Sequence, residues 1–154
     1  MREPVTAYVG LGANLGDAVA AVRGAIAKLD DLPGTRVIRA SSLYRTAPHE
    51  ASGPDFVNAV ARIETHLDAM ELLARLQGIE NDAGRERPYR NAPRTLDLDL
   101  LLYGSARMSG GRLTLPHPRM GERAFVLVPL AEIAPELVSA QQLAAVADQA
   151  IERL

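Results

Sequence analysis

The sequence predicts an α+β fold of the ferredoxin-like type, in which a βαββαβ core forms an antiparallel sheet backed by helices. Segments with the two-residue period of strands and the 3.6-residue period of helices follow one another in the order strand, helix, strand, strand, helix, strand. The connections carry Pro, Gly or Asp where a turn or a helix cap is needed. The 154 residues suffice for one hydrophobic core. We expect an added hairpin and C-terminal helices to complete the architecture.

The first half of the core begins with a strand over residues 5–11, which leads into a glycine-rich connection. Asp17 is expected to cap the following helix, which stops before Pro33 and Gly34. A second strand is expected over about 35–45 and a third over about 56–65. The core-facing side of the third strand is expected to consist of Val57, Ala59, Ala61 and Ile63.

The second half begins with the capping pattern D-x-x-E at Asp68 and Glu71, and its helix is expected to end near Gly84. An arginine-rich loop then leads into a strand that contains two acids. The remaining expectations are a hairpin turning at Gly110 and Gly111, short helical pieces interrupted by prolines over 116–137, and an amphipathic helix from about Ser139 to Leu154.

Composition and charge narrow the function classes. A hydrophobic content of 47% with 23% charged residues is typical of a globular protein, so we expect one domain over 1–154. The absence of cysteine excludes disulfides, a thiolate nucleophile and a cysteine zinc site, and it fits a cytoplasmic location. We expect no membrane span, because no apolar run approaches about 20 residues. The net charge of −2 argues against general nucleic-acid binding.

Asp97 and Asp99 lie inside the leucine-rich run PRTLDLDLLLYG. Because side chains on a strand alternate between faces, both carboxylates are expected on one face with Leu101 and Tyr103, and the even-numbered leucines 96–102 on the other. Two interpretations are open. The acids can be solvated charges that keep an edge strand from pairing with other chains. They can instead hold a divalent cation, since Mg²⁺ is commonly bound by one or two carboxylates and by substrate phosphates.

Arginine is concentrated around this strand. Between Arg85 and Arg123 the chain has eight arginines and four acids. The planar guanidinium fork suits bidentate contacts with phosphate. A cationic segment around paired carboxylates is typical of a site for a polyanion that binds together with its metal ion.

The stretch GLGANLG follows a strand and precedes a helix, as a phosphate-binding turn would. Its glycines, at positions 10, 12 and 16, do not have the G-x-G-x-x-G spacing, and no G-K-[ST] follows, so Rossmann and P-loop sites are excluded. We interpret the stretch as a tight strand-to-helix turn. The three histidines lack the spacing of a zinc site. His117, fixed between two prolines and close to arginines, is equally compatible with a loop residue and with a phosphate-facing one.

Phe56 and Asn58 are expected on one face of the third strand, opposite its apolar side. A ring beside an amide suits a flat heterocycle, which can stack on the ring and hydrogen-bond to the amide. Packing beneath the 47–55 loop is the alternative for Phe56, and the local spacing by itself slightly favours packing.

Five strings together closely resemble the 6-hydroxymethyl-7,8-dihydropterin pyrophosphokinase family of folate biosynthesis. They are YRTAP, DFVNAVARIET, GRER, PRTLDLDLLLYG and LPHPRMGERAFVLVPLAEIAPEL, and the resemblance runs from about residue 5 to about residue 138. It implies an enzyme that transfers the β,γ-diphosphate of ATP to the hydroxymethyl group of the dihydropterin and releases AMP. It also implies two Mg²⁺ ions, with ATP and the pterin as small-molecule substrates. We expect a monomer.

By matching position, the resemblance implies that Asp97 and Asp99 hold both ions and act in catalysis with Arg85 and Arg94. The residues implied for ATP are Glu80, Arg85, Arg87, Arg94, Leu100, Arg112, His117 and Arg123. The pterin is expected to stack between Phe56 and Phe125, with Asn58 and the backbone around Thr46, Ala47 and His49 at its hydrogen-bonding edge. The sequence departs from the family at Asn91, where many members have an aromatic residue.

Two other function classes fit the sequence less well. Ferredoxin-like sheets can carry RNA on an aromatic face, but the aromatic spacing of an RNA-binding strand is absent. A small-molecule sensor on the same scaffold would not need the paired acids.

Overall fold

The computed structural model describes residues 3–14, 16–47, 54–84 and 96–154. The elements in chain order are β1 (Val5–Ala13), α1 (Ala18–Asp30), β2 (Thr35–Ala40), β3 (Tyr44–Thr46), β4 (Phe56–Thr65), α2 (Ala69–Gly84), β5 (Asp97–Tyr103), β6 (Met108–Ser109), β7 (Thr114–Leu115), η1 (Met120–Glu122), α3 (Ala124–Ile133), η2 (Pro135–Leu137), α4 (Ala140–Ala145) and β8 (Ile151–Arg153). Among the described helices, none is long and apolar enough to cross a membrane.

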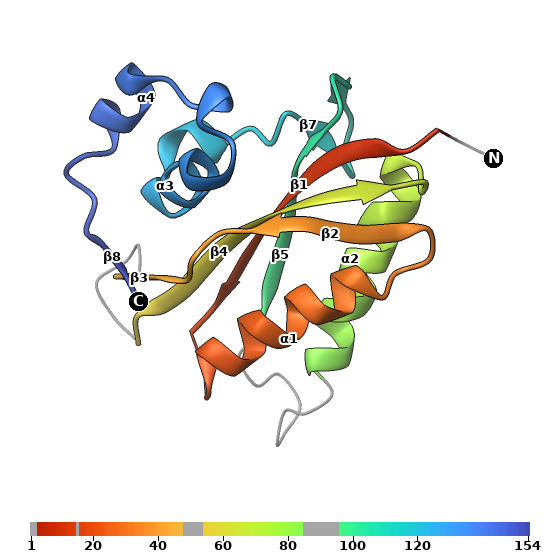
Figure 1. Cartoon of the computed structure of the whole chain (residues 1–154), viewed down its shortest axis with the longest axis horizontal. Helices are drawn as coiled ribbons and strands as arrows, with labels where there is room; N and C mark the ends of the chain where they lie inside the picture. Colours follow the sequence, from red (N-terminus) through yellow and green to blue (C-terminus); the bar gives the residue numbers. More distant parts are fainter. Residues whose placement is uncertain (1–2, 15, 48–53, 85–95) are drawn as a thin grey trace.

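The main sheet has the strand order β5–β1–β4–β3–β8, and β2 also pairs with β4. Every strand pair is antiparallel. Strands β2, β4, β1 and β5 with helices α1 and α2 form the predicted βαββαβ unit, and α3 and α4 lie on the other side of the sheet (Figure 1). The predicted ferredoxin-like fold is confirmed. The predicted hairpin is confirmed as β6 and β7.

Helices α1 and α2 begin at the predicted caps. The Asp17 carboxylate accepts a hydrogen bond from the Ala20 N–H at 3.0 Å. Asp68 and Glu71 cap each other's backbone, because the Asp68 carboxylate accepts from the Glu71 N–H at 2.8 Å and the Glu71 carboxylate accepts from the Asp68 N–H at 3.1 Å. These bonds satisfy N–H groups that have no partner inside a helix.

The two faces of the sheet belong to two separate cores. One core joins α1 and α2 to the face that carries Val9, Ala59 and Leu98. The other joins α3 to the face that carries Tyr8, Val60 and Leu101. Because strand residues alternate between the faces, Asp97, Asp99, Phe56 and Asn58 share the α3 side of the sheet.

The expectation of a single strand over 35–45 is wrong. The chain forms β2 and β3, which pair with different parts of β4. Between them, the Ser41 hydroxyl accepts a hydrogen bond from the Val60 N–H at 2.9 Å. A serine side chain that takes the place of a backbone partner interrupts the strand, which resumes at Tyr44.

The expected alternation along β5 holds for residues 96–101 and is wrong for Leu102 and Tyr103. Tyr8 pairs with Leu102 and Val9 with Leu100, so Leu101 is an extra residue in a β-bulge. The bulge reverses the alternation. Leu102 therefore packs toward α3, and Tyr103 joins the core of α1 and α2.

The C-terminal expectations need two corrections. The helix expected over 139–154 ends at Ala145, and residues Ile151–Arg153 form β8 on the outer side of β3, where they cover an edge that would otherwise be open. The short helical pieces expected over 116–137 are confirmed as η1, α3 and η2, but the expected interruption is wrong at Pro129, which lies inside the 10-residue helix α3. Pro129 removes one helical hydrogen bond without ending the helix.

Candidate active site

A cavity of about 580 Å³ opens on the α3 side of the sheet. It lies where the C-terminal end of β1 meets the N-terminal ends of β4 and β5, and the antiparallel pairing places these ends side by side. The start of α3, the end of β3 and the segment before β8 complete its wall. The lining residues are Gly10, Leu11, Gly12, Thr46, Ala47, Phe56, Asn58, Ala59, Asp97, Asp99, Glu122, Arg123, Ala124, Phe125, Val126, Gln149 and Ala150.

Two glycines of β1 form the floor of the cavity. Gly10 pairs with Asp99, and Gly12 pairs with Asp97 on one side and Asn58 on the other. A methyl group on Gly12 would lie 2.9 Å from Asn58 Nδ2, so only glycine lets the amide lie against the strand. Gly10 lies in β1, as the strand expected over 5–11 predicts, but the interpretation of GLGANLG as a turn is wrong for Gly12, because β1 continues to Ala13. Gly16, with φ +61°, does lie in the turn before α1.

A polar pair on β3 and β4 forms one side of the cavity. The Thr46 hydroxyl donates a hydrogen bond to Asn58 Oδ1 at 2.7 Å, and both residues are buried. This bond fixes the amide, so that its Nδ2 lies on the Gly12 side. Phe56 is half-buried beside this pair and directly opposite Thr46 in the strand register.

The first turn of α3 forms the opposite side. Phe125 is half-buried at the cavity, and the Arg123 guanidinium lies 5.3 Å from the centre of its ring, in a cation–π arrangement. One face of the Phe125 ring is therefore covered by a cation. The structure brings both phenylalanines of the chain and the Asn58 amide to one cavity.

The acidic pair lies at the β5 edge of the cavity. Asp97 is exposed and Asp99 is half-exposed. His117 Nε2 lies 3.9 Å from Asp99 Oδ1, while His117 Nδ1 accepts from the Arg119 N–H at 3.2 Å. With Nδ1 used as an acceptor, Nε2 carries the proton and faces Asp99. A bond from the His117 N–H to the Leu101 carbonyl, at 2.9 Å, ties the histidine loop to β5.

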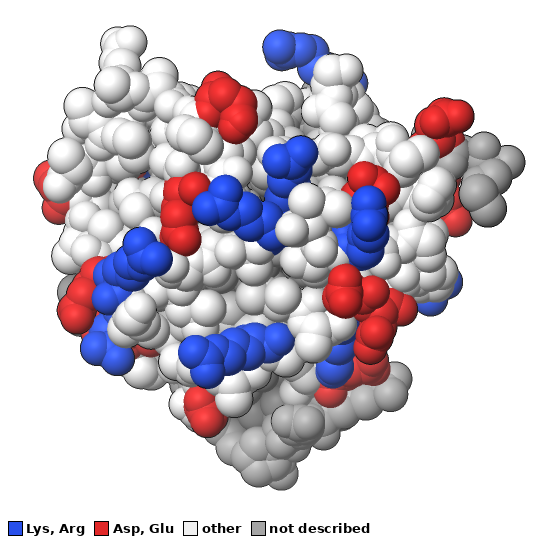
Figure 2. Space-filling model, in the orientation of Figure 1, with Lys and Arg blue, Asp and Glu red and all other residues white. Residues whose placement is uncertain are grey.

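Charge in the described lining is mainly negative, with three carboxylates (Asp97, Asp99 and Glu122) and one guanidinium (Arg123). Within the described residues, no three His, Asp or Glu side chains gather as a metal cluster. Two carboxylates with an open side nonetheless suit Mg²⁺, which completes its shell with water and phosphate oxygens. On the face of the molecule shown in Figure 2, basic and acidic side chains are interspersed, and that face has no broad basic surface.

Some expected site residues lie elsewhere or cannot be placed. Leu100 is buried in the core on the opposite face of β5 from the two acids, so only its backbone can serve the site. Glu80 on α2 accepts a hydrogen bond from the Leu98 N–H at 2.8 Å, at the outer edge of the sheet. Arg112 is exposed in the β6–β7 hairpin and does not line the cavity. The expectations for His49, Arg85, Arg87 and Arg94 fall outside the described residues.

Sequence reasoning missed Gly10, Gly12, Glu122, Gln149 and Ala150 as cavity residues. A pair of glycines two positions apart within a strand is a signal for the first two, because both would remove side chains from the same face. Nothing local marks Gln149, which reaches the cavity only because β8 pairs with β3.

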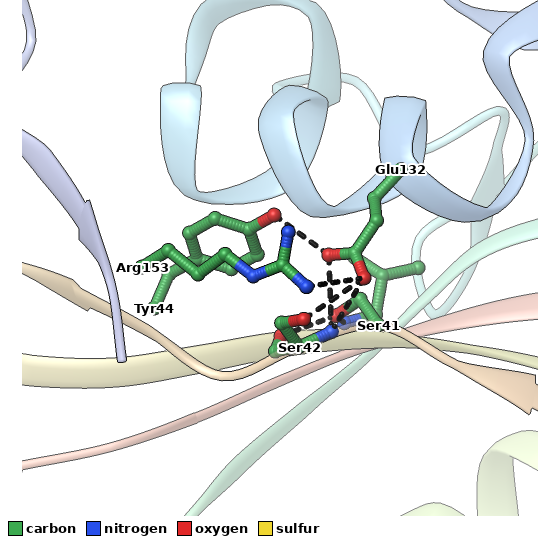
Figure 3. A network of polar contacts seen from close by, with 6 residues as sticks. Ser41, Ser42, Tyr44, Glu132 and Arg153 are labelled. Atoms are coloured by element: carbon green, nitrogen blue, oxygen red, sulfur yellow. Dashed lines mark hydrogen bonds and ion pairs between the residues drawn. The ribbon is translucent and has the colours of Figure 1, made fainter.

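A polar network behind the cavity fixes β3, the strand that carries Thr46 (Figure 3). The Glu132 carboxylate of α3 accepts from the Ser42 N–H at 3.0 Å, the Ser42 hydroxyl at 2.9 Å and the Tyr44 hydroxyl at 2.6 Å. Arg153 of β8 lies 3.9 Å away from it. Burial alone would raise the pKa of Glu132, but these donors and Arg153 together lower it. Burial and the bond to Glu132 raise the pKa of Tyr44 to about 12, so its hydroxyl remains a donor at neutral pH.

Comparison with known proteins identifies the family. The family model described as 7,8-dihydro-6-hydroxymethylpterin-pyrophosphokinase (HPPK) matches residues 8–135. A relative from Haemophilus influenzae, named 2-amino-4-hydroxy-6-hydroxymethyldihydropteridine pyrophosphokinase, is 47% identical over 135 residues, which cover 87% of this chain and 84% of that protein. A relative of the same name from Pseudomonas aeruginosa is 46% identical over 131 residues, which cover 84% of this chain and 81% of that protein.

A solved structure supports the fold. The crystal structure of a Plasmodium falciparum HPPK-DHPS triple mutant superposes with a TM-score of 0.71 at 13% identity, over 88% of this chain. The present chain spans 41% of that longer one. The family match over residues 8–135 and the close relatives lead to one conclusion: the chain belongs to the 7,8-dihydro-6-hydroxymethylpterin-pyrophosphokinase family.

Proposed function

We propose that this chain transfers diphosphate from ATP to the hydroxymethyl group of 6-hydroxymethyl-7,8-dihydropterin in this cavity, giving AMP and the pterin diphosphate for folate biosynthesis. The observation that carries the proposal is the joining of two different subsites in one cavity, an aromatic and amide wall and a pair of carboxylates. A flat heterocycle fits the first subsite, and a metal-bound phosphate chain fits the second. The whole of 1–154 acts as one domain, as a cytoplasmic monomer.

The pterin subsite consists of Phe56 and Phe125 on either side and the Thr46–Asn58 pair at the edge. The covered face of Phe125 belongs to Arg123, so the heterocycle stacks on the other face. Asn58 and the backbone around Ala47 and His49 bond to the edge of the heterocycle. In this orientation the hydroxymethyl group would point toward Asp97 and Asp99, a direction supported by their position in the lining of the same cavity.

The phosphate subsite centres on Asp97 and Asp99, which would hold two Mg²⁺ ions. Held by these carboxylates, the ions would offset the charge of the ATP triphosphate and so favour transfer of its β,γ-diphosphate at an edge of the cavity that is otherwise acidic. His117 donates through Nε2, and Arg123 contributes positive charge at the cavity, together with Arg85, Arg87 and Arg94; Arg112, outside the cavity lining, adds positive charge only from a distance. Glu80 and the Leu100 backbone belong to the nucleotide end. The chain's own contribution to the reaction is mainly orientation of two substrates within one cavity.

The test is a turnover assay with Mg²⁺, ATP and 6-hydroxymethyl-7,8-dihydropterin, in which AMP formation is measured. We expect the wild type to form AMP only when the pterin is present. Asp97→Asn and Asp99→Asn should each lower kcat at least about 100-fold, because each removes a metal-binding charge at the site of transfer. Circular dichroism and melting temperature should stay close to wild type.

Asp148→Asn is the matched control, because it removes an exposed carboxylate that does not line the cavity. It should retain wild-type kcat. Aspartate variants of near-wild-type activity would refute the metal assignment, and a wild type that makes no AMP would refute the proposed function.

A further inference from the structure

The C-terminal segment 139–154 lies beyond the residues matched by the family model, yet it forms part of the cavity wall. Gln149 and Ala150 line the cavity. Directly after them, Ile151 pairs with Thr46 as β8 joins the sheet. The segment therefore connects Thr46, which bonds to the Asn58 amide on one side of the cavity, to the start of α3 on the opposite side.

The Gln149 side chain makes two hydrogen bonds at the start of α3. Its Oε1 accepts from the Ala124 N–H at 2.8 Å, and its Nε2 donates to the Glu122 carbonyl at 2.9 Å. Arg123 is the N-cap residue of α3, and its own side chain makes no capping bond. Gln149 thus supplies from a distant segment a cap that the local sequence lacks.

These two bonds hold the backbone on both sides of Arg123. Residue 123 has an extended backbone, with φ −129° and ψ 121°, between the 3₁₀ turn η1 and α3. Arg123 and Phe125 project from this point, and both line the cavity. A shift at the junction would move the guanidinium and the ring together, because they are two residues apart and stacked at 5.3 Å.

Gln149 is itself held in place by neighbours outside the cavity. The Gln149 N–H donates to the Val146 carbonyl at 3.0 Å, and the Leu154 N–H donates to the Leu43 carbonyl at 2.9 Å. Val146 is buried against α3, and Arg153 reaches Glu132. Because the segment is fixed at both ends, the amide of Gln149 can transmit the position of β3 to the start of α3.

We propose that Gln149 is a positioning residue, which sets the distance between the Phe125 side and the Thr46 side of the heterocycle subsite and so determines pterin affinity. The proposal rests on the proposed function of the cavity. It assigns to Gln149 a role in the binding of the pterin, and not in the phosphate chemistry. The reason is that Phe125 supplies one of the two aromatic walls, whereas Arg123 shares the phosphates with other cations.

The test compares Gln149→Ala with Gln142→Ala. Gln142 is a matched control, because its side chain also caps a helix of the same segment: it accepts from the Ser139 N–H at 2.8 Å, at the start of α4. Helix α4 does not line the cavity. Gln149→Ala should raise the KM for the pterin about tenfold. This is the loss of affinity expected when the net contribution of about one hydrogen bond is removed. Its kcat and its KM for ATP should stay within about twofold, and Gln142→Ala should change none of the three.

A third variant, Gln149→Glu, keeps the acceptor for the Ala124 N–H and places a negative charge at a helix N-terminus, where it is favourable. Its pterin KM should lie between those of wild type and Gln149→Ala, because the bond from the Ala124 N–H is kept while the donor to the Glu122 carbonyl is lost. A purely structural role would predict equal effects of Gln149→Ala and Gln142→Ala, and that result, or an unchanged pterin KM in Gln149→Ala, would overturn the proposal.

Failure of this proposal is distinguishable from failure of the proposed function. The wild type is assayed first for AMP, and pterin fluorescence titrations give the Kd of wild type and variants without turnover. Wild-type AMP formation with equal pterin Kd in wild type and Gln149→Ala refutes only the role of Gln149. A wild type that neither forms AMP nor binds the pterin refutes both.

Discussion

The hydrogen bond from the Thr46 hydroxyl to Asn58 Oδ1 determines how this amide can meet a ligand. Because the oxygen is already bonded to Thr46, the Nδ2 group is left as the donor that the cavity can use. Gly12 lies against that group and leaves room for it. Three residues from three neighbouring strands thus fix one donor, and a buried donor in a fixed position selects strongly for a ligand that accepts from it.

The first prediction concerns Gly12. Gly12→Ala would place a methyl group 2.9 Å from Asn58 Nδ2, so the amide must move away from its bond to Thr46. We expect the KM for the pterin to rise about tenfold or more, as for a misplaced hydrogen-bonding group of about 1.4 kcal/mol. Steady-state kinetics with the pterin varied at saturating ATP measures it.

Gly10→Ala is the comparison variant, since it adds the same methyl group to the same strand. There the nearest atoms belong to the Leu101 side chain at 3.5 Å, which is an ordinary contact distance. Its pterin KM should rise much less than that of Gly12→Ala. Equal KM values for the two variants would mean that the position of Asn58 does not control pterin binding.

At the level of single residues, periodicity predicted the shared face of Phe56 and Asn58 but could not predict the role of Gln149. The common face of Phe56 and Asn58 follows from the two-residue period of β4, and the capping roles of Asp17 and Asp68 follow from local chemistry. The role of Gln149 depends on contacts between segments 25 residues apart in sequence, which no local pattern carries.

At the scale of elements, the sequence predicted the strands and helices of the βαββαβ core and failed where a tertiary contact outweighs local preference. Periodicity alone cannot locate the bulge at Leu101, because the pairing with β1 decides which residue is left over. Similarly, residues 151–153 are strand because β3 offers them an edge. The division between β2 and β3 depends on the bond from the Val60 N–H to Ser41 and on the bond from the Ser42 N–H to Glu132, and both form only in the folded chain.

The second prediction concerns the tie between α3, β3 and β8. Glu132→Gln replaces a carboxylate that accepts from three donors, and its amide NH₂ would face the Ser42 N–H. At pH 7 we expect the free energy of unfolding to fall by about 1–3 kcal/mol, the range for lost hydrogen bonds to a charged group. Urea unfolding followed by circular dichroism measures it.

The pH dependence of this loss follows from the lowered pKa of Glu132. In the unfolded chain a glutamate binds its proton near pH 4.3, and in the folded protein it does so only at lower pH. The stabilisation is therefore complete above about pH 4.3 and is lost as the pH falls through the lower, folded-state pKa. The difference between wild type and Glu132→Gln should narrow as the pH falls below about 4.3. A constant difference would contradict the assigned cause.

Glu64→Gln is the control for this measurement. Glu64 pairs with Arg36 at 3.4 Å on the surface, where the Arg36 side chain is 68% exposed. Exposed pairs contribute about 0–1 kcal/mol, so this variant should lose less stability than Glu132→Gln at neutral pH.

For the whole molecule, the arrangement of layers explains why the site lies at one end of the sheet. Helices α1 and α2 cover one face, and α3 covers only part of the other (Figure 1). The uncovered part carries the glycine floor, the amide and the acids. The sheet and the start of α3 both contribute to the cavity wall, so a ligand in the cavity stabilises the contact between these two layers as well as its own subsite.

The last prediction uses that coupling. Because the described cavity lining has three carboxylates and one guanidinium, ATP should bind well only together with Mg²⁺. A non-hydrolysable ATP analogue with Mg²⁺, at about 100 times its Kd, should raise the melting temperature by about 5–10 °C, from about 2.7 kcal/mol of binding stabilisation in a domain of this size. The same analogue with EDTA should give a much smaller shift.

Asp97→Asn and Asp99→Asn should lose most of the Mg²⁺-dependent shift, and Asp148→Asn should keep it. An equal shift with and without Mg²⁺ would show that the nucleotide is held by the cationic side chains alone, and that the two aspartates are not its metal site.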